Sequence, residues 1–287
     1  MSKIGNLPIL VGVDGSPVAL AALRWAAVDA ARHEVPLHLL YAIGVLGEFR
    51  SGFELGQFDF DSYRQGGLDA LETARATAVA ESASITQLDI STELVDAPPI
   101  PLLRDRSQTA RLLVVGTHGL GAVNRRLLGS VSTALARHAA CPVAVIPETA
   151  APSDGPVVVG VDGSRSSVHA IEIAFDQAAF RGVELVAVHT WSDFLRFESS
   201  DQMQEEGEEL LARSIAGFGE KYPEVPVHRI VTEDRPAERL LMLGDKAQLI
   251  VVGSHGRGGF AGMTLGSVGQ AVLHAAQVPV IIARSAS

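Results

Sequence analysis

The sequence contains the same unit twice. The stretch ILVGVDGSPVALAALRWA, which begins at Ile9, matches VVVGVDGSRSSVHAIEIA, which begins at Val157. Further on, ARLLVVGTHG matches AQLIVVGSHG. Each copy spans roughly 140 residues, the size of an independent hydrophobic core, so the repeat predicts two domains rather than a solenoid. We place them at residues 1–150 and 151–287, which meet in the linker-like stretch PETAAPSDGP.

Short apolar runs without polar alternation recur along the first copy. They cover residues 9–13, 37–43, 88–95, 112–116 and 143–146. Such runs are typical of strands buried on both faces, as in parallel sheets covered by helices. Helical patterns lie between them, and one begins after Ser16, a good N-cap, with Pro17 at its first position. The alternation predicts an α/β fold of two tandem, doubly wound, open parallel sheets with right-handed crossovers.

Composition and charge exclude several classes of protein. The formal net charge is −10, so the chain lacks the basic field that binding to nucleic acid needs. No apolar stretch reaches the roughly 20 residues that cross a bilayer, and the start MSKIGNLPILVGVDG does not resemble a signal peptide. Cys141 is the single cysteine, which rules out an intrachain disulfide and favours a buried small residue. We therefore expect a cytoplasmic protein that binds neither nucleic acid nor membranes.

A spaced glycine pattern occurs once in each copy. Two glycines flank two residues, nine residues follow, and a Gly-Ser pair closes the pattern. Its members are Gly116, Gly119, Gly129 and Ser130 in the first copy, and Gly253, Gly256, Gly266 and Ser267 in the second. In open parallel sheets, ligands bind beyond the carboxyl ends of the strands, which is where the pattern lies.

The residues of this pattern favour an anion site. Gly116 and Gly119 allow a positive φ or a close backbone approach that a side chain would block. The helix that begins at Ser130 offers free N–H groups, its dipole and the hydroxyls of Ser130 and Ser132. We expect the nine intervening residues to form an arch over the bound group.

An aspartate and a histidine recur beside the pattern. Asp14 and Asp162 each follow the first strand of their copy, in VGVDGS. They are placed either to accept hydrogen bonds from a sugar hydroxyl or to make an Asx turn before the first helix, and the recurrence favours neither. His118 and His255 follow the fourth strand. They either act as a catalytic base or orient the loop and touch phosphate, and no partnering acid is evident nearby in sequence.

On these motifs, the chain resembles tandem universal stress proteins of the ATP-binding type. The family signature is Gly, two residues, Gly, nine residues, Gly, then Ser or Thr, and both copies match it. The resemblance covers essentially the whole chain. It implies a Rossmann-like fold with strand order 3-2-1-4-5, and ATP, with or without Mg²⁺, held between the first and fourth strands.

The resemblance also implies residues for each part of the nucleotide. Asp14 and Asp162 would contact the ribose, with Gly15 and Gly163 beside them, and Ala42 and Thr190 would offer backbone groups to adenine. The phosphates would be held in the first copy by Gly116, His118, Gly119, Arg126, Gly129, Ser130, Val131 and Ser132. In the second copy they would be held by Gly253, His255, Gly256, Gly266, Ser267 and Val268.

The two implied sites differ in ways that predict unequal affinity. Gly269 takes the place of Ser132, and the arches carry Arg125 and Arg126 in the first copy but only Arg257 in the second. A charge-assisted contact from an arginine to phosphate contributes about 1.5–3 kcal/mol when desolvated. We expect the first site to bind ATP at least as tightly as the second.

Chemistry that would indicate an enzyme is missing from the sequence. There is no Gly-x-x-x-x-Gly-Lys-Ser/Thr loop, no Gly-x-Ser-x-Gly elbow and no metal-ligand spacing of histidines. The stretch GRGGFA fits a dinucleotide fingerprint but follows the fourth strand rather than the first. We expect a non-enzymatic, ATP-binding regulator of a stress or dormancy response that acts on an unidentified protein partner. The alternatives are a slow ATPase or ATP-dependent transferase, and a scaffold that has lost nucleotide binding.

Three further features of the sequence lead to expectations outside the glycine pattern. The stretch from Gly44 to Gly67 carries four phenylalanines and forms either a lid or partner contact, or an irregular loop packed on its own domain. The acidic stretch from Met203 predicts a helix with a solvated face. The fifth strands are expected at sheet edges, where the resemblance implies pairing across a two-fold axis, either between the two domains or between two chains in a homodimer.

Overall fold

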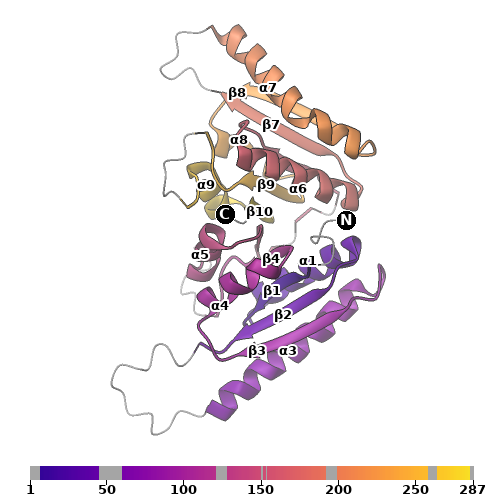
Figure 1. The fold of residues 1–287 in the computed structure, drawn as a ribbon, viewed down its shortest axis with the longest axis vertical. Coiled ribbons are helices and arrows are strands. Elements are labelled where there is room, and N and C mark those ends of the chain that lie inside the picture. The colour runs from indigo at the N-terminus through magenta and orange to yellow at the C-terminus, as the bar shows by residue number, and fades with distance from the viewer. Residues whose placement is uncertain are drawn as a thin grey trace, which may run out of the picture. The chain divides into compact units, whose positions relative to one another are not determined.

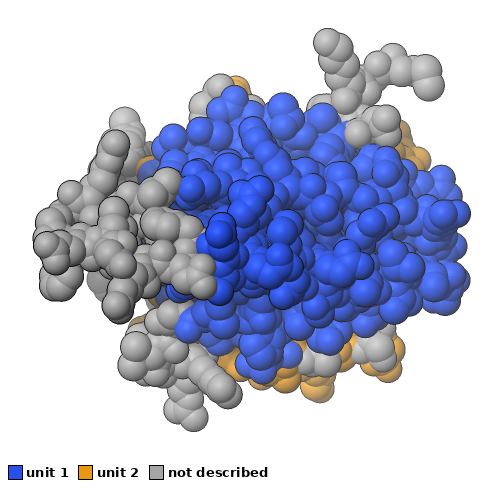
Figure 2. Space-filling view, turned by 90° about the horizontal axis from the view of Figure 1, so that it is seen from below, with its two compact units in different colours: residues 1–148, 286–287 blue, residues 149–285 orange. Residues whose placement is uncertain are grey.

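Strands and helices alternate along the whole described chain (Figure 1). A computed structural model describes residues 7–44, 60–120, 128–149, 151–152, 154–191, 199–257 and 264–284. These residues fall into two compact units, the first ending at Glu148 and the second beginning at Thr149 (Figure 2). The domain limits 1–150 and 151–287 stay predictions.

Unit 1 contains one parallel sheet with helices between its strands. Its elements are β1 (Ile9–Val13), α1 (Pro17–His33), β2 (Leu37–Ala42), α3 (Phe60–Ser82), β3 (Ile90–Val95), α4 (Pro99–Arg106), β4 (Leu112–Gly116), α5 (Ser130–His138) and β5 (Val143–Ile146). The strands lie in the order β3-β2-β1-β4-β5, and their pairings are parallel. A short 3-10 turn, Ser107–Thr109, follows α4.

Unit 2 repeats this architecture. Its elements are β6 (Val157–Gly160), α6 (Arg165–Arg181), β7 (Leu185–Trp191), α7 (Ser200–Lys221), β8 (Val227–Glu233), α8 (Pro236–Gly244), β9 (Leu249–Gly253), α9 (Ser267–Ala275) and β10 (Val280–Ala283). The strand order is β8-β7-β6-β9-β10, again parallel. The predicted doubly wound α/β fold with strand order 3-2-1-4-5 is therefore confirmed in both units.

The central strands carry the core of each unit. Ile9 to Val11 of β1 are at most 2% exposed, and Val157 to Val159 of β6 are 0% exposed. Full burial of each such side chain contributes about 1.5–3 kcal/mol. The helix that follows covers the sheet with alanines spaced four residues apart, Ala22, Ala26 and Ala30 in α1, all 0% exposed. Because these side chains are small, the helix backbone lies close to the strands.

Helix caps follow the sequence-based expectation. The hydroxyl of Ser16 accepts a hydrogen bond from the Ala19 N–H at 3.1 Å, and the hydroxyl of Ser164 accepts from the Ser167 N–H at 3.2 Å. The prediction that Ser16 caps the first helix is confirmed.

Cys141 is buried, as predicted. No helix within the described residues is long and apolar enough to cross a bilayer.

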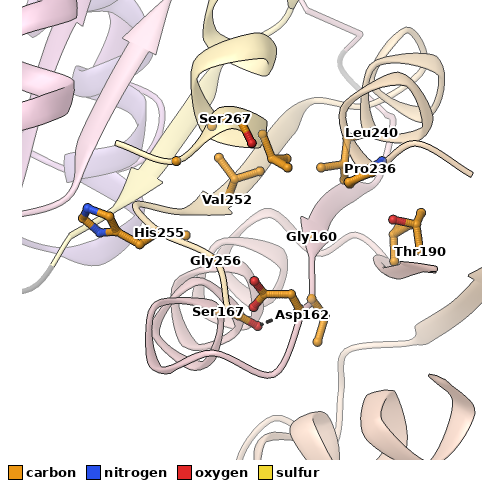
Figure 3. A pocket seen from close by; sticks show the side chains of 16 residues that line it. Gly160, Asp162, Ser167, Thr190, Pro236, Leu240, Val252, His255, Gly256 and Ser267 are labelled. Carbon is orange, nitrogen blue, oxygen red and sulfur yellow. Dashed lines mark hydrogen bonds between the residues drawn. The ribbon is translucent and has the colours of Figure 1, made fainter. Parts of the chain in front are cut away.

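The direction of the crossovers reverses at one point in each sheet. Strand β1 pairs with β2 on one side and with β4 on the other, and β6 pairs with β7 and β9 in the same way. At such a point the connecting segments leave the carboxyl ends of the two central strands in opposite directions, which opens a crevice. Figure 3 shows this point in unit 2, where Asp162 follows β6 and His255 and Gly256 follow β9.

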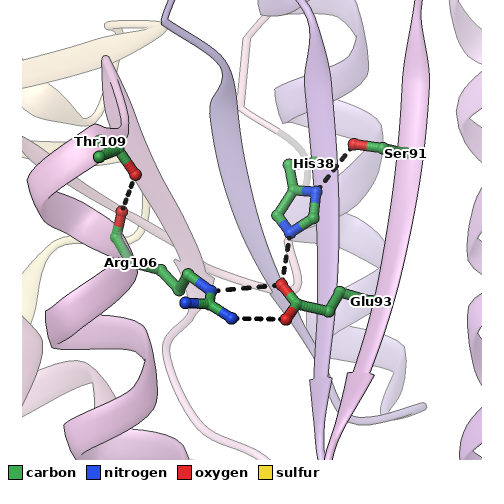
Figure 4. Close-up of polar contacts among 5 residues, drawn as sticks. All are labelled: His38, Ser91, Glu93, Arg106 and Thr109. Atoms are coloured by element: carbon green, nitrogen blue, oxygen red, sulfur yellow. Dashed lines mark hydrogen bonds and ion pairs between the residues drawn. The ribbon is translucent and has the colours of Figure 1, made fainter.

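A polar cluster links the outer strand β3 to β2 and α4 within unit 1 (Figure 4). The guanidinium of Arg106 donates to both carboxylate oxygens of Glu93, at 3.3 and 2.5 Å. The imidazole of His38 bridges Glu93 Oε2 at 3.1 Å and Ser91 Oγ at 2.8 Å. Hydrogen bonding from Arg106 holds the pKa of Glu93 below its usual value. The equivalent strand positions of unit 2 are Val186 and Ile230, which cannot form this cluster.

We predict that Glu93→Gln makes the free energy of unfolding of unit 1 fall less steeply as the pH is lowered. Because the pKa of Glu93 is lowered by folding, its contribution is present above the usual value near 4.5 and is lost as the pH falls through the lowered value. Urea unfolding from about pH 6 down to about pH 3 measures this. The matched control is Glu72→Gln, which removes an exposed carboxylate of α3 without an ion pair among the described residues. The prediction is contradicted if the free energy of unfolding falls equally steeply between these pH values with and without Glu93→Gln.

Candidate functional site

The crevice of unit 1 gathers most of the residues predicted from the first copy. It is a cavity of about 380 Å³ at the carboxyl ends of β1 and β4. The predicted residues that line it are Asp14, Ala42, Gly116, His118, Gly119, Gly129, Ser130, Val131 and Ser132. Cavities that bind small molecules commonly start at about 300 Å³, so the space suits a small ligand.

The crevice of unit 2 repeats this arrangement (Figure 3). Its cavity is about 300 Å³. The predicted residues that line it are Asp162, Thr190, Gly253, His255, Gly256, Gly266, Ser267 and Val268. Two segments far apart in the sequence, one after β6 and one after β9, thus meet around the same space.

Two of the predicted residues are not among those that line the cavities, and a third lies outside the described residues. Gly15 and Gly163 have φ values of 83° and 78°, and they form the turn that follows each aspartate. Arg126, together with Arg125, lies outside the described residues. The arch predicted between Gly119 and Gly129 falls largely on these undescribed residues as well.

The aspartate of each crevice holds two backbone segments together. Asp14 Oδ1 accepts from the Ser16 N–H at 2.9 Å, which is the Asx turn expected as one alternative. Its Oδ2 accepts from the Leu120 N–H at 3.1 Å, in the loop after β4. Asp162 makes the same two contacts, with Ser164 at 2.9 Å and Arg257 at 3.1 Å. Each carboxylate oxygen can accept a second hydrogen bond, so the contact to a ribose hydroxyl stays possible as the other alternative.

The first two glycines of each pattern are required by close contacts within the unit. A Cβ on Gly116 would lie 2.6 Å from Val18 Cγ1, and one on Gly253 would lie 3.0 Å from the Ser166 backbone. A Cβ on Gly256 would lie 2.8 Å from Asp162 Oδ2, and Gly119 stands in the same relation to Asp14. None of the four has a positive φ. The expected close approach is therefore present, but the backbone is approached by the unit's own helix and aspartate.

The helices beside the crevices begin without a side-chain cap. Gly129 is the N-cap of α5 and Gly266 is the N-cap of α9, and neither helix start has a capping hydrogen bond from a side chain. Helices α1 and α6, in contrast, are capped by serine hydroxyls. The N–H groups in the first turn of an uncapped helix have no partner within the helix, and the helix dipole favours an anion there. Both crevices thus carry a cradle for an anion.

Backbone hydrogen bonds fix these helix starts against the glycine loops. The Gly129 N–H donates to the Thr117 carbonyl at 2.7 Å, and the Gly266 N–H donates to the Ser254 carbonyl at 2.8 Å. A Cβ on Gly129 would lie 3.1 Å from the Cα of His118. The closing glycine therefore lets the helix start and the loop come together at the mouth of the cavity.

Ser132 and the two histidines are engaged by neighbouring groups. The Ser132 hydroxyl donates to the Gly116 carbonyl at 2.7 Å, so its proton is directed to the backbone rather than to an anion. His118 Nδ1 lies 3.1 Å from the hydroxyl of Thr117, and His255 Nδ1 lies 3.0 Å from that of Ser254. These contacts tie each ring to the residue before it.

The sequence reasoning missed an apolar wall in each crevice. Pro99 and Leu103 of α4 line the first cavity, and Pro236 and Leu240 of α8 line the second. Gly12 lets Leu103 reach β1, because a Cβ on it would lie 3.2 Å from Leu103 Cδ1. A signal was available, since both copies place a leucine four residues after a proline that starts a helix. Such a wall suits the apolar faces of a flat ring.

We predict that Gly116→Ala lowers the free energy of unfolding of unit 1 by about 1–3 kcal/mol, because the added methyl group overlaps Val18. Urea unfolding measures the effect. The control is Gly66→Ala in α3, where a Cβ would meet nothing within 4 Å. This substitution should stabilise the helix by about 0.5–1 kcal/mol. Equal effects of the two substitutions would show that α1 does not press on Gly116.

A family model and individual sequence relatives identify the same family for this chain. The universal stress protein family model matches residues 6–147 and again residues 155–284. Universal stress protein Rv1996 of Mycobacterium tuberculosis is 44% identical over 302 residues, covering 97% of this chain and 95% of that protein. Universal stress protein Rv2005c of the same organism is 44% identical over 288 residues, covering 96% of each.

Solved structures share the fold at lower identity. The crystal structure of a universal stress protein from Archaeoglobus fulgidus has a TM-score of 0.69 and 20% identity, and the match covers 98% of this chain and 97% of that one. This likeness supports the fold alone. The family model and the sequence relatives together cover nearly the whole chain, which therefore belongs to the universal stress protein family.

Proposed function

We propose that the chain binds ATP in both crevices and acts as a nucleotide-dependent regulator of a stress or dormancy response. One observation carries the proposal. In each unit an uncapped helix start, an aspartate and an apolar wall surround one cavity at the point where the sheet reverses direction. These are the three surfaces that a triphosphate, a ribose and a base need.

Each surface has a role toward one part of ATP. The N–H groups of the first turn of α5 and the Ser130 hydroxyl would hold phosphate oxygens. Asp14 would accept a hydrogen bond from the ribose, and adenine would lie against Leu103 with the backbone of Ala42 at its edge. Unit 2 offers Ser267, Asp162, Leu240 and Thr190 for the same roles. Mg²⁺, where present, would be held mainly by the phosphates themselves.

Regulation would follow from the two contacts of the aspartate. ATP would engage β1 through Asp14 and the helix start through its phosphates, and so would favour the arrangement in which Asp14 holds the loop at Leu120. A ligand shifts only those states that it binds unequally. The loop after β4 is accordingly the surface that a protein partner would read, and the loop after β9 is its counterpart.

A slow ATPase or transferase is the second candidate. Asp14 is the only carboxylate among the described residues that line the first crevice, and both its oxygens already accept backbone N–H groups. This arrangement favours binding over water activation. Nucleotide released on denaturing the purified protein separates the candidates, because ATP supports the regulator and complete conversion to ADP supports the enzyme.

We predict that Ser130→Asp and Ser267→Asp each remove one ATP site. Both serines are exposed at the first position of their helix. An aspartate there stabilises the helix start by about 0.3–1 kcal/mol, so folding is retained while the carboxylate repels phosphate. Isothermal titration should give two ATP per wild-type chain, one per single variant and none in the double variant.

The matched controls are Ser130→Ala and Ser267→Ala, which add no charge and should keep two sites. Comparing the two single aspartate variants also tests the expected order of affinity, because each isolates one crevice. A wild-type chain that binds no ATP at millimolar concentration, or an aspartate double variant that binds as well as the wild type, would refute the proposal.

A further inference from the structure

Unit 2 holds a second cavity beside its nucleotide crevice. It measures about 490 Å³ and lies between β7 and α7. Thr190 lines both cavities, and Arg257, which directly follows Gly256 of the crevice, lines the second one. The two cavities are therefore neighbours that share Thr190 and are joined by the step from Gly256 to Arg257.

Two arginines supply positive charge to this second cavity. Arg213 of α7 and Arg257 of the glycine loop both line it, and neither forms an ion pair within the described residues. The Arg257 guanidinium lies over Gly163, where a Cβ would be 2.9 Å from its Nη2. The Arg257 backbone donates to Asp162 at 3.1 Å. A guanidinium is thus held next to the aspartate that would contact the ribose.

A buried histidine supplies an acceptor at the same place. His189 lines the cavity and is 9% exposed. Its Nδ1 lies 2.7 Å from the Val161 carbonyl, which can only accept, so Nδ1 carries the proton and Nε2 carries the lone pair. Burial lowers the pKa of His189, so the ring is neutral near pH 7. Nε2 has no hydrogen-bond partner within the described residues and can accept from a ligand.

Acidic groups set a further requirement on the ligand. Glu206 and Glu209 of α7 also line the cavity, and Glu206 accepts from Gln202 at 3.1 Å. These carboxylates oppose a bare anion and favour a ligand that also donates hydrogen bonds. A phosphorylated sugar meets both demands, since its phosphate pairs with arginines and its hydroxyls donate to His189 or to a carboxylate.

Unit 1 lacks the histidine and both arginines of this cavity, and it keeps a carboxylate, Asp69, at the position of Glu209. The equivalent of His189 on β2 is Tyr41, and the equivalent of Arg257 after Gly119 is Leu120. Gly67 packs on Tyr41 as Gly207 packs on His189, which makes Thr73 the equivalent of Arg213. Unit 1 therefore serves as a comparison site in which Leu120 and Thr73 stand at the positions of the two arginines.

We propose that unit 2 recognises adenine nucleotides that carry a phosphate on the 2′ or 3′ oxygen of the ribose, with that phosphate in the cavity between β7 and α7. The proposal rests on the proposed function, because it places the ribose at Asp162. In dinucleotide-binding folds an acidic residue binds the ribose 2′-hydroxyl, or a nearby arginine accommodates a 2′-phosphate instead. In unit 2 Asp162 would bind the ribose hydroxyl that stays free, and Arg257 and Arg213 would pair with the phosphate.

The test compares ligands that differ by one phosphate. In the Ser130→Asp chain, where only unit 2 is open, adenosine 3′,5′-bisphosphate or its 2′,5′ isomer should bind about tenfold more tightly than AMP, a difference of about 1.4 kcal/mol. In the Ser267→Asp chain, where only unit 1 is open, neither bisphosphate should gain over AMP. Isothermal titration supplies the dissociation constants.

Two substitutions with opposite expected effects on the affinity for the bisphosphates make the test more specific. Arg213→Gln should remove most of the gain while leaving AMP binding unchanged, and Glu209→Gln should enlarge it. Equal binding of AMP and both bisphosphates to the Ser130→Asp chain, with ATP still bound, would overturn this inference alone. If ATP binds neither crevice of the wild-type chain, the proposed function fails and this inference fails with it.

Discussion

The first-turn N–H groups of α5 and α9 need acceptors, and no side chain caps either helix. Glycine at the N-cap leaves these donors open, whereas Ser16 and Ser164 satisfy the corresponding groups of α1 and α6 with a hydroxyl. The uncapped ends of α5 and α9 line the crevices directly, at Gly129 to Ser132 and at Gly266 to Gly269. Everything proposed about nucleotide binding depends on these donors being available to an anion.

Comparing the two units distinguishes the backbone contacts that both share from the side chains in which they differ. Asp14 and Asp162 make the same pair of hydrogen bonds, and Gly119 and Gly256 each lie against the Oδ2 atom of the aspartate in their unit. Side chains around this frame differ between the units, with Leu120 in one place and Arg257 in the other. Two crevices with one backbone design can therefore differ in which nucleotide they prefer.

The fold was predictable because it rests on a local signal. Strands such as Ile9–Val13 and Val143–Ile146 match the predicted runs, since a strand buried on both faces needs continuous apolar residues. The glycine pattern and Asp14 could also be predicted. Glycine at a fixed spacing indicates a tight turn or a close backbone approach, and a carboxylate directly after a strand indicates an Asx turn or a ligand contact. Of the two alternatives expected at Gly116 and Gly119, the close backbone approach is present. The positive φ belongs instead to Gly15, which follows the aspartate.

Other parts of the site depend on contacts that sequence does not encode locally. The wall formed by Leu103 requires α4 to cross the end of β1, and Ser132 turns to the Gly116 carbonyl only because α5 starts beside β4. The cavity around His189 likewise arises where Gly207 brings α7 onto β7. These are consequences of tertiary packing between segments far apart in the chain.

The most direct test of the account is a crystal structure of the chain grown with excess ATP. We expect phosphate oxygens within hydrogen-bonding distance of the backbone N–H groups that begin α5 and α9, with the ribose at Asp14 and Asp162. Crevices that stay empty, or phosphates held by side chains away from these helix starts, would contradict it.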